Sequence, residues 1–114
     1  MKPLRPFDYF EPQTLDEAGR IQSEKGEGAF FLAGGTDLLV RMKKGDLRPT
    51  ALVNLKRIPG LTRIEPASPN GLSLGALASI SGVEGSPLVR EKYGVLAQAA
   101  AVLGSPSIRV LATL

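Results

Sequence analysis

The feature that most constrains this chain is a short apolar run, AFFLA (29–33), which is followed by two adjacent glycines. The run is too short for a helix and has glycine on both sides, so it predicts a strand that is buried on both faces. After Gly34 and Gly35, Thr36 can cap a new helix that ends at Gly45. The sequence therefore predicts a strand, a tight turn and a helix.

Strands and helices are expected to alternate around this turn. The aromatic run 7–10 predicts an opening strand, and the capping box formed by Thr14 and Glu17 predicts a helix that ends at Gly26. Residues 51–55 predict a further short strand. This alternation favours parallel pairing in a small sheet.

The second half of the chain predicts a hairpin and several helices. Two apolar segments, 61–64 and 72–74, flank the turn-rich segment PASPNG (66–71), which is typical of a hairpin between antiparallel strands. Helical segments are expected after Ser79, from Ser86-Pro87 and over 95–103. The last of these is apolar on most faces, which predicts burial. Gly104 is expected to stop that helix and Ser105-Pro106 to prevent its continuation, and residues 108–111 are expected to run extended.

Composition excludes several classes of chemistry. The chain has no cysteine and no histidine, so this polypeptide cannot carry a disulfide, a thiolate metal site or a histidine-assisted nucleophile. If the protein handles electrons, a bound cofactor must supply the chemistry. No apolar run has the length of a signal peptide or of a membrane span, so a cytoplasmic location is expected.

A basic cluster is the main charged feature of the chain, and it consists of Arg41, Lys43, Lys44 and Arg48. We interpret it as a solvated face, with a docking patch for an anionic partner as the alternative. No aromatic residues interleave with it, which argues against nucleic acid as a partner.

The glycine turn carries the sharpest chemical signal. A backbone without Cβ atoms can approach a ligand closely, and the free amides at a helix start favour an anion such as pyrophosphate. The turn matches neither a Walker A loop nor the GxGxxG fingerprint of nicotinamide sites. From the residues alone it is equally an ordinary strand-to-helix turn. Asp37 then either satisfies the helix start or contacts a nucleotide hydroxyl.

Several motifs in order add a family resemblance that covers nearly the whole chain: FDYFEPQTLDEA, LAGGTDLLVRMK, ALVNLKRIPGL, GLSLGALASIS and GSPSIRVLATL. They resemble the FAD-binding subunits or domains of molybdenum hydroxylases, such as xanthine dehydrogenase, the carbon monoxide dehydrogenase medium subunit and 4-hydroxybenzoyl-CoA reductase. The resemblance implies an α+β fold of the PCMH or vanillyl-alcohol-oxidase type. A small α/β subdomain would cover 1–57, and the start of a second, truncated FAD-binding subdomain would cover 58–114.

The resemblance also implies a role in electron transfer. FAD would pass electrons from iron–sulfur clusters to an external acceptor, and the partners would be a molybdopterin-binding large subunit and a [2Fe-2S] small subunit. The chain would then be an oxidoreductase component, with substrate oxidation on another subunit. No residue is assigned a catalytic or metal-binding role.

Site residues follow from the same resemblance. The glycines' amides and the Thr36 hydroxyl would hold the FAD pyrophosphate within one segment: Phe31, Leu32, Ala33, Gly34, Gly35, Thr36, Asp37 and Leu38. Thr113 would contact a phosphate from a second loop, with disorder as its alternative. Leu103 would approach the flavin, although a core position suits it better.

Other positions keep two interpretations. Arg109 either reaches a phosphate or a partner carboxylate, or it is solvated beside a strand. Gly75-Ala76 either lines the nucleotide site or serves packing. Val110 departs from the family pattern, which has a polar residue there, and the pattern continues into Gly-Gly-Asn after Leu114.

Three functional hypotheses therefore stand. The first is an FAD-binding electron-transfer component. The second is a truncated, non-catalytic fragment or assembly module that does not retain FAD and is inactive alone. The third is a generic phosphate-binding protein that uses only the Gly34-Gly35 turn.

Overall fold

The computed structural model describes residues 4–114, which form two compact units, one ending at Pro59 and the other running from Gly60 to Leu114. The first unit contains β1 (Asp8–Phe10), α1 (Leu15–Lys25), a 3-10 turn η1 (Gly26–Gly28), β2 (Ala29–Leu32), α2 (Leu38–Lys44) and β3 (Ala51–Asn54). The second contains β4 (Ile64–Ala67), β5 (Gly71–Leu74), α3 (Ile80–Gly85), α4 (Pro87–Lys92), α5 (Gly94–Val102) and α6 (Pro106–Leu111).

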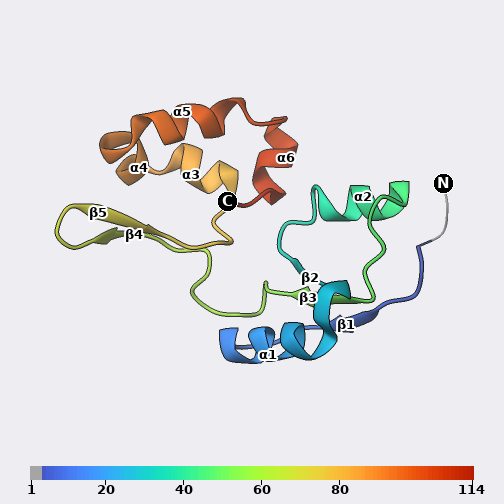
Figure 1. Ribbon diagram of the computed structural model, residues 1–114. Helices are drawn as coiled ribbons and strands as arrows, with labels where there is room; N and C mark the ends of the chain where they lie inside the picture. Colours follow the sequence, from blue (N-terminus) through green and yellow to red (C-terminus); the bar gives the residue numbers. More distant parts are fainter. Residues whose placement is uncertain (1–3) are drawn as a thin grey trace. The chain divides into compact units, whose positions relative to one another are not determined.

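The first unit is built on a three-stranded sheet in the order β1-β3-β2. Both strand pairs are parallel, as the alternation of elements predicted. Every residue of the central strand β3 is buried. The chain crosses from β1 to β2 in one direction and returns to β3 in the other, so right-handed crossovers place the two helices on opposite faces. Figure 1 shows α1 and α2 on opposite sides of the sheet.

The strand β2 differs from the prediction of burial on both faces. Ala29 and Leu32 are buried, but Phe31 is 48% exposed. Register and the alternation of side chains place Phe31 on the same face as Phe10, over whose ring the Lys25 ammonium lies. Because β2 is an edge strand, Phe31 has a neighbouring strand on one side only within this unit.

The start of α1 follows the predicted capping box with one change. The Thr14 hydroxyl accepts a hydrogen bond from the Glu17 amide at 3.1 Å. The Glu17 carboxylate accepts from the amide of Gln13 at 3.1 Å, one residue earlier than the usual capping-box donor. On the inner face, Ala18 is buried, whereas Leu15 at the first position is 61% exposed.

In the second unit, β4 and β5 form the predicted antiparallel hairpin, with Ile64 opposite Leu74 and Ala67 opposite Gly71. The first strand begins at Ile64 rather than Leu61 and extends through Pro66, so the turn is shorter than the predicted 66–71 loop. Proline fits there because each strand of a two-stranded sheet has an open edge.

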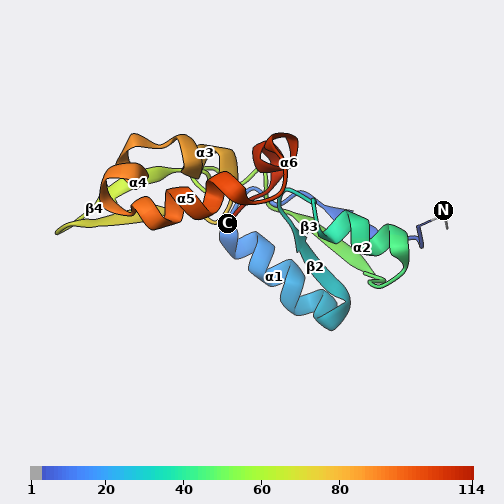
Figure 2. The same cartoon turned by 90° about the horizontal axis from the view of Figure 1, so that it is seen from above.

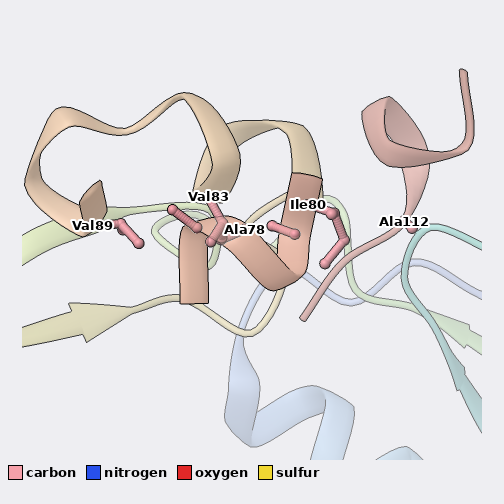
Figure 3. Close-up of a cluster of buried hydrophobic side chains, with 7 residues drawn as sticks. Ala78, Ile80, Val83, Val89 and Ala112 are labelled. Carbon is pink, nitrogen blue, oxygen red and sulfur yellow. The ribbon is translucent and has the colours of Figure 1, made fainter. Parts of the chain in front are cut away.

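Small apolar side chains form the core of the second unit. The buried cluster is drawn in Figure 3 and consists of Ala78, Ile80, Val83, Val89, Ala97, Ala100 and Ala112. Residues of the hairpin, Ile64, Leu72 and Leu74, pack against it. Figures 1 and 2 accordingly both show the hairpin running alongside the helices.

The helix α5 is buried on one side only, which corrects the prediction of burial on most faces. Ala97 and Ala100, three residues apart, are buried against the core that α3 shares. Val95 and Val102 are 81% and 80% exposed. In a helix this narrow contact stripe leaves the opposite residues uncovered within the unit.

The segment 108–111 is helical rather than extended, because it belongs to α6. The Ser105 hydroxyl accepts a hydrogen bond from the Ile108 amide at 3.2 Å, and Pro106 occupies the first helical turn. The same signal at Ser86-Pro87 starts α4, as predicted. Ser86 is also the C-cap of α3, whereas α5 ends at Val102, before Ser105.

Candidate functional site

The carboxyl ends of the three parallel strands lie at one edge of the sheet in the first unit. At this edge β2 leads into the Gly34-Gly35 turn, and the central strand β3 ends at Asn54. Ligands of open α/β sheets bind beyond the carboxyl ends of the strands. This edge is therefore the candidate site.

The turn requires glycine at position 35. Gly35 has a φ of +77°, which side chains other than glycine rarely adopt. A Cβ atom there would lie 3.0 Å from a terminal methyl of Leu39 and 3.3 Å from one of Leu32. Since Leu32 is itself buried, the space cannot open freely.

The helix α2 begins one residue later than predicted. Asp37, not Thr36, is its N-cap, and no side chain completes the cap. The Asp37 carboxylate lies 3.8 Å from the guanidinium of Arg41 one turn along, and both side chains are largely exposed. With seven residues α2 has a small dipole, so the turn amides supply most of the capacity to bind an anion.

The turn offers backbone amides that have no backbone partner in the part of the chain that the structure describes. Across residues 4–114, the amides of 34–38 donate to no backbone carbonyl, and bonding resumes with the Leu39 amide, which donates to the Gly35 carbonyl at 3.2 Å. Residues 33–36 are half-buried, so solvent or a ligand reaches them. A row of unpaired backbone amides is an arrangement that binds phosphate groups.

A polar network around the buried Asn54 borders the turn, and the sequence interpretation missed it. Asn54 is 7% exposed, and its side-chain amide donates to the Tyr9 hydroxyl at 2.6 Å. Its side-chain oxygen accepts from the Lys56 amide at 3.0 Å. The Tyr9 hydroxyl donates to Glu11 at 2.9 Å. The signal available in sequence was a polar residue at the end of an otherwise apolar strand.

The network reaches the glycine turn directly. The ammonium of Lys56 donates to the carbonyl of Ala33 at 3.0 Å, just before Gly34. The next residue, Arg57, pairs instead with Glu11 at 2.6 Å. The edge thus combines unpaired amides, one tethered ammonium and one neutralised guanidinium.

We predict that Tyr9→Phe lowers the free energy of unfolding by about 1–2 kcal/mol, because it leaves the Asn54 amide buried without its acceptor. Urea unfolding measures the change. Tyr93→Phe is the matched control: Tyr9 and Tyr93 are similarly exposed, at 49% and 47%, but within residues 4–114 the Tyr93 hydroxyl forms no hydrogen bond, so its change should stay within about 0.5 kcal/mol. Equal effects of the two substitutions would contradict the role given to this hydrogen bond.

The remaining two predicted site residues belong to the second unit. Leu103 is the C-cap of α5 and is 43% exposed, so the core interpretation is wrong. Thr113 pairs with Ser79 in an antiparallel bridge, flanked by a 2.8 Å bond from the Ile80 amide to the Ala112 carbonyl. The structure therefore orders Thr113, and the alternative of disorder is wrong.

Arg109 and Gly75 both make contacts within the second unit. The Arg109 side chain is 14% exposed and lies 3.3 Å from the Glu84 carboxylate, and it donates to the Leu103 carbonyl at 3.2 Å. A solvated Arg109 beside a strand is thus corrected to a packed residue on α6. At Gly75 a Cβ atom would collide with the Leu61 carbonyl, which gives this glycine a packing role.

The second unit also has a hollow of about 670 Å³, lined mainly by apolar side chains of β5 and α5, including Leu72, Leu74, Val95 and Leu96. Because this lining is mainly apolar, it suits a phosphate poorly. No cluster of three potential metal ligands occurs in the part of the chain that the structure describes. Over the same residues, no helix has the length and apolarity needed to span a membrane.

Comparisons with known proteins give one consistent result. The family model described as "FAD binding domain in molybdopterin dehydrogenase" matches residues 5–114. The FAD subunit of nicotinate dehydrogenase from Eubacterium barkeri is 32% identical over 97% of this chain. The carbon monoxide dehydrogenase medium chain from Hydrogenophaga pseudoflava is 32% identical over 90%.

A solved structure agrees. A chain of the reconstituted CO dehydrogenase from Oligotropha carboxidovorans superimposes with a TM-score of 0.92 at 28% identity and covers 98% of this chain. The present chain spans 38%, 36% and 39% of the lengths of these three proteins.

Proposed function

We propose that this chain, which belongs to the family of FAD-binding domains of molybdopterin dehydrogenases, supplies the pyrophosphate-binding part of an FAD site. Membership confirms the resemblance drawn from the sequence motifs, and with it the α+β FAD-binding fold and FAD as the cofactor of the family. The chain corresponds to a part of its relatives, so the activity of a whole subunit is a proposal.

The observation that carries the proposal is the row of unpaired amides over 34–38, next to a glycine whose φ is positive. These residues fit a pyrophosphate, because the turn offers several donors, is half-exposed and has an ammonium beside it. We assign the contacts to Phe31, Leu32, Ala33, Gly34, Gly35, Thr36, Asp37 and Leu38.

Within that segment the residues have different tasks. Gly34, Gly35 and Thr36 give amides, and Thr36 adds a hydroxyl that does not cap α2. Leu32 is buried and its side chain packs beside Gly35 of the turn, whereas Phe31 is half-exposed and offers an apolar surface. Asp37 is exposed, so its carboxylate can turn toward a ribose hydroxyl without opposing the phosphates.

The second unit would contribute the other contacts. Thr113 is proposed as a phosphate contact, and its backbone is fixed by the bridge to Ser79. Leu103 is proposed to lie near the flavin, and its partial exposure leaves an apolar surface for one. These two assignments rest on the family resemblance. We retain the division into a small α/β subdomain (1–57) and a second FAD-binding subdomain (58–114).

Electron transfer is the proposed role of the complete subunit. Bound FAD would accept electrons from iron–sulfur clusters and deliver them to an external acceptor, while this chain's residues bind and orient it. The proposed partners are a molybdopterin-binding large subunit and a [2Fe-2S] small subunit. The similarity to a medium chain and to FAD subunits of dehydrogenases supports this assembly.

We predict that the purified chain binds FAD. FAD fluorescence is measured while the chain is titrated in. ADP should compete with FAD because it carries the pyrophosphate, whereas adenosine should compete far less. No binding at tens of micromolar would favour the non-catalytic module, and equal competition by simple phosphates would favour a generic phosphate site.

A further inference from the structure

We propose that Lys56 is a phosphate-binding residue of this site, holding the glycine turn with one donor and the dinucleotide pyrophosphate with the others. The inference rests on the proposed function and names a residue that lies outside the segment 31–38. It follows from the position of Lys56, its hydrogen bonds and the charges around it.

The topology brings Lys56 to the turn. Lys56 follows the central strand β3, whose neighbour β2 pairs with it in parallel up to the pair Leu32 and Asn54. The two strands therefore deliver the Ala33 carbonyl and Lys56 to the same edge, although these residues are far apart in sequence. The Lys56 ammonium donates to that carbonyl at 3.0 Å.

The backbone of Lys56 is fixed as well. Its amide donates to the side-chain oxygen of Asn54 at 3.0 Å, and Asn54 is itself buried and bonded to the Tyr9 hydroxyl. The base of the Lys56 side chain is thus anchored to two strands. An anchored lysine loses less conformational freedom when its ammonium engages a ligand.

The ammonium retains donors for a ligand. A lysine ammonium has three donors, and the Ala33 carbonyl takes one of them. A carbonyl is a neutral acceptor and leaves the positive charge uncompensated. Because Ala33 adjoins Gly34, the remaining donors of the ammonium lie beside the unpaired turn amides. A phosphate there would accept hydrogen bonds from the ammonium and from the amides.

The neighbouring charges single out this lysine. Arg57 pairs with Glu11, and Arg41 pairs with Asp37 across the first turn of α2. Among residues 4–114, no carboxylate forms an ion pair with Lys56. The ammonium therefore supplies positive charge to the turn that no internal acid cancels.

The test compares Lys56→Met with Lys44→Met in the same chain. Both changes remove one exposed ammonium from the first unit, but Lys44 lies in the last turn of α2, at the helix end away from the glycine turn. Lys56→Met is expected to raise the dissociation constants of FAD and ADP about tenfold, the loss of one charge-assisted hydrogen bond. Lys44→Met should change both less than twofold.

Three further readouts separate a phosphate contact from a structural effect. The binding of adenosine, which has no phosphate, should be unchanged by Lys56→Met. Lys56→Arg, which keeps charge and donors, should stay within about threefold of the wild type. Added salt should weaken ADP binding to the wild type more than to Lys56→Met. Far-UV circular dichroism confirms that each variant is folded.

The outcomes distinguish the two proposals. A wild type that binds neither FAD nor ADP overturns the proposed function and this inference with it. A wild type that binds both, together with a Lys56→Met variant within twofold of it, overturns the inference alone. An equal loss of adenosine and ADP binding would also overturn it, because the effect would then not concern phosphate.

Discussion

Gly75→Ala is expected to destabilise the second unit by about 3 kcal/mol, a large part of the stability of a small domain. The backbone following β5 passes so close to the segment preceding β4 that an added methyl would overlap the Leu61 carbonyl oxygen. The approach is fixed on both sides, by a 2.8 Å bond from the Gly75 amide to the Arg63 carbonyl and a 2.9 Å bond from the Leu77 amide to the Leu61 carbonyl. No side-chain rotation relieves a collision with backbone.

Urea unfolding of the variant measures this loss. Gly85→Ala is the matched control, because within the described part of the chain a Cβ atom there meets no side chain or neighbouring segment within 4 Å, and the residue ends helix α3. That substitution should leave the urea midpoint of unfolding unchanged or raise it slightly, because alanine stabilises a helix more than glycine does, by up to about 1 kcal/mol. Similar midpoints for the two variants would refute the packing role of Gly75.

Gly35→Ala is expected to weaken FAD binding by more than about tenfold and to cost about 2 kcal/mol of stability. A positive φ is strained for alanine, and the new methyl would also crowd Leu39 and the buried Leu32. Relief requires a change of the turn backbone, which turns the amides of 34–38 away from a shared anion. Fluorescence titration with FAD and thermal unfolding measure the two effects.

Gly45→Ala is the control that separates the effect of backbone strain on stability from the effect on FAD binding. Gly45 has a φ of +83°, but among residues 4–114 a Cβ atom there meets no atom of another element within 4 Å, and Gly45 lies at the opposite end of α2. The control should therefore lose about 1 kcal/mol of stability and keep its FAD affinity. If both variants lost affinity equally, the glycine turn would not be the binding element.

Local signals in the sequence predicted the elements well where a few neighbouring residues decide them. Thr14 and Ser86-Pro87 start helices as expected, because a cap depends on the next three residues. Ser105-Pro106 carries the same start signal and begins α6, but the expected end of the preceding helix concealed it. The motif order, which spans nearly the whole chain, identified the family and its cofactor.

Burial was harder to predict from the apolar pattern. Phe31, Val95 and Val102 read as core residues, yet they are exposed within their units. An apolar run indicates that its side chains are buried in some contact, but it does not show which residues or segments make that contact. That depends on strand order and helix packing, which are set by contacts distant in sequence.

The glycine turn was therefore determined by the sequence, because its conformation follows from Gly34, Gly35 and the residues beside them. Which groups surround the turn was decided only by the tertiary structure. The order β1-β3-β2 carries the Lys56 ammonium from the third strand to the Ala33 carbonyl after the second, and ties Tyr9 of the first to Asn54. Parallel pairing joins residues far apart in the chain, and no local pattern encodes that register.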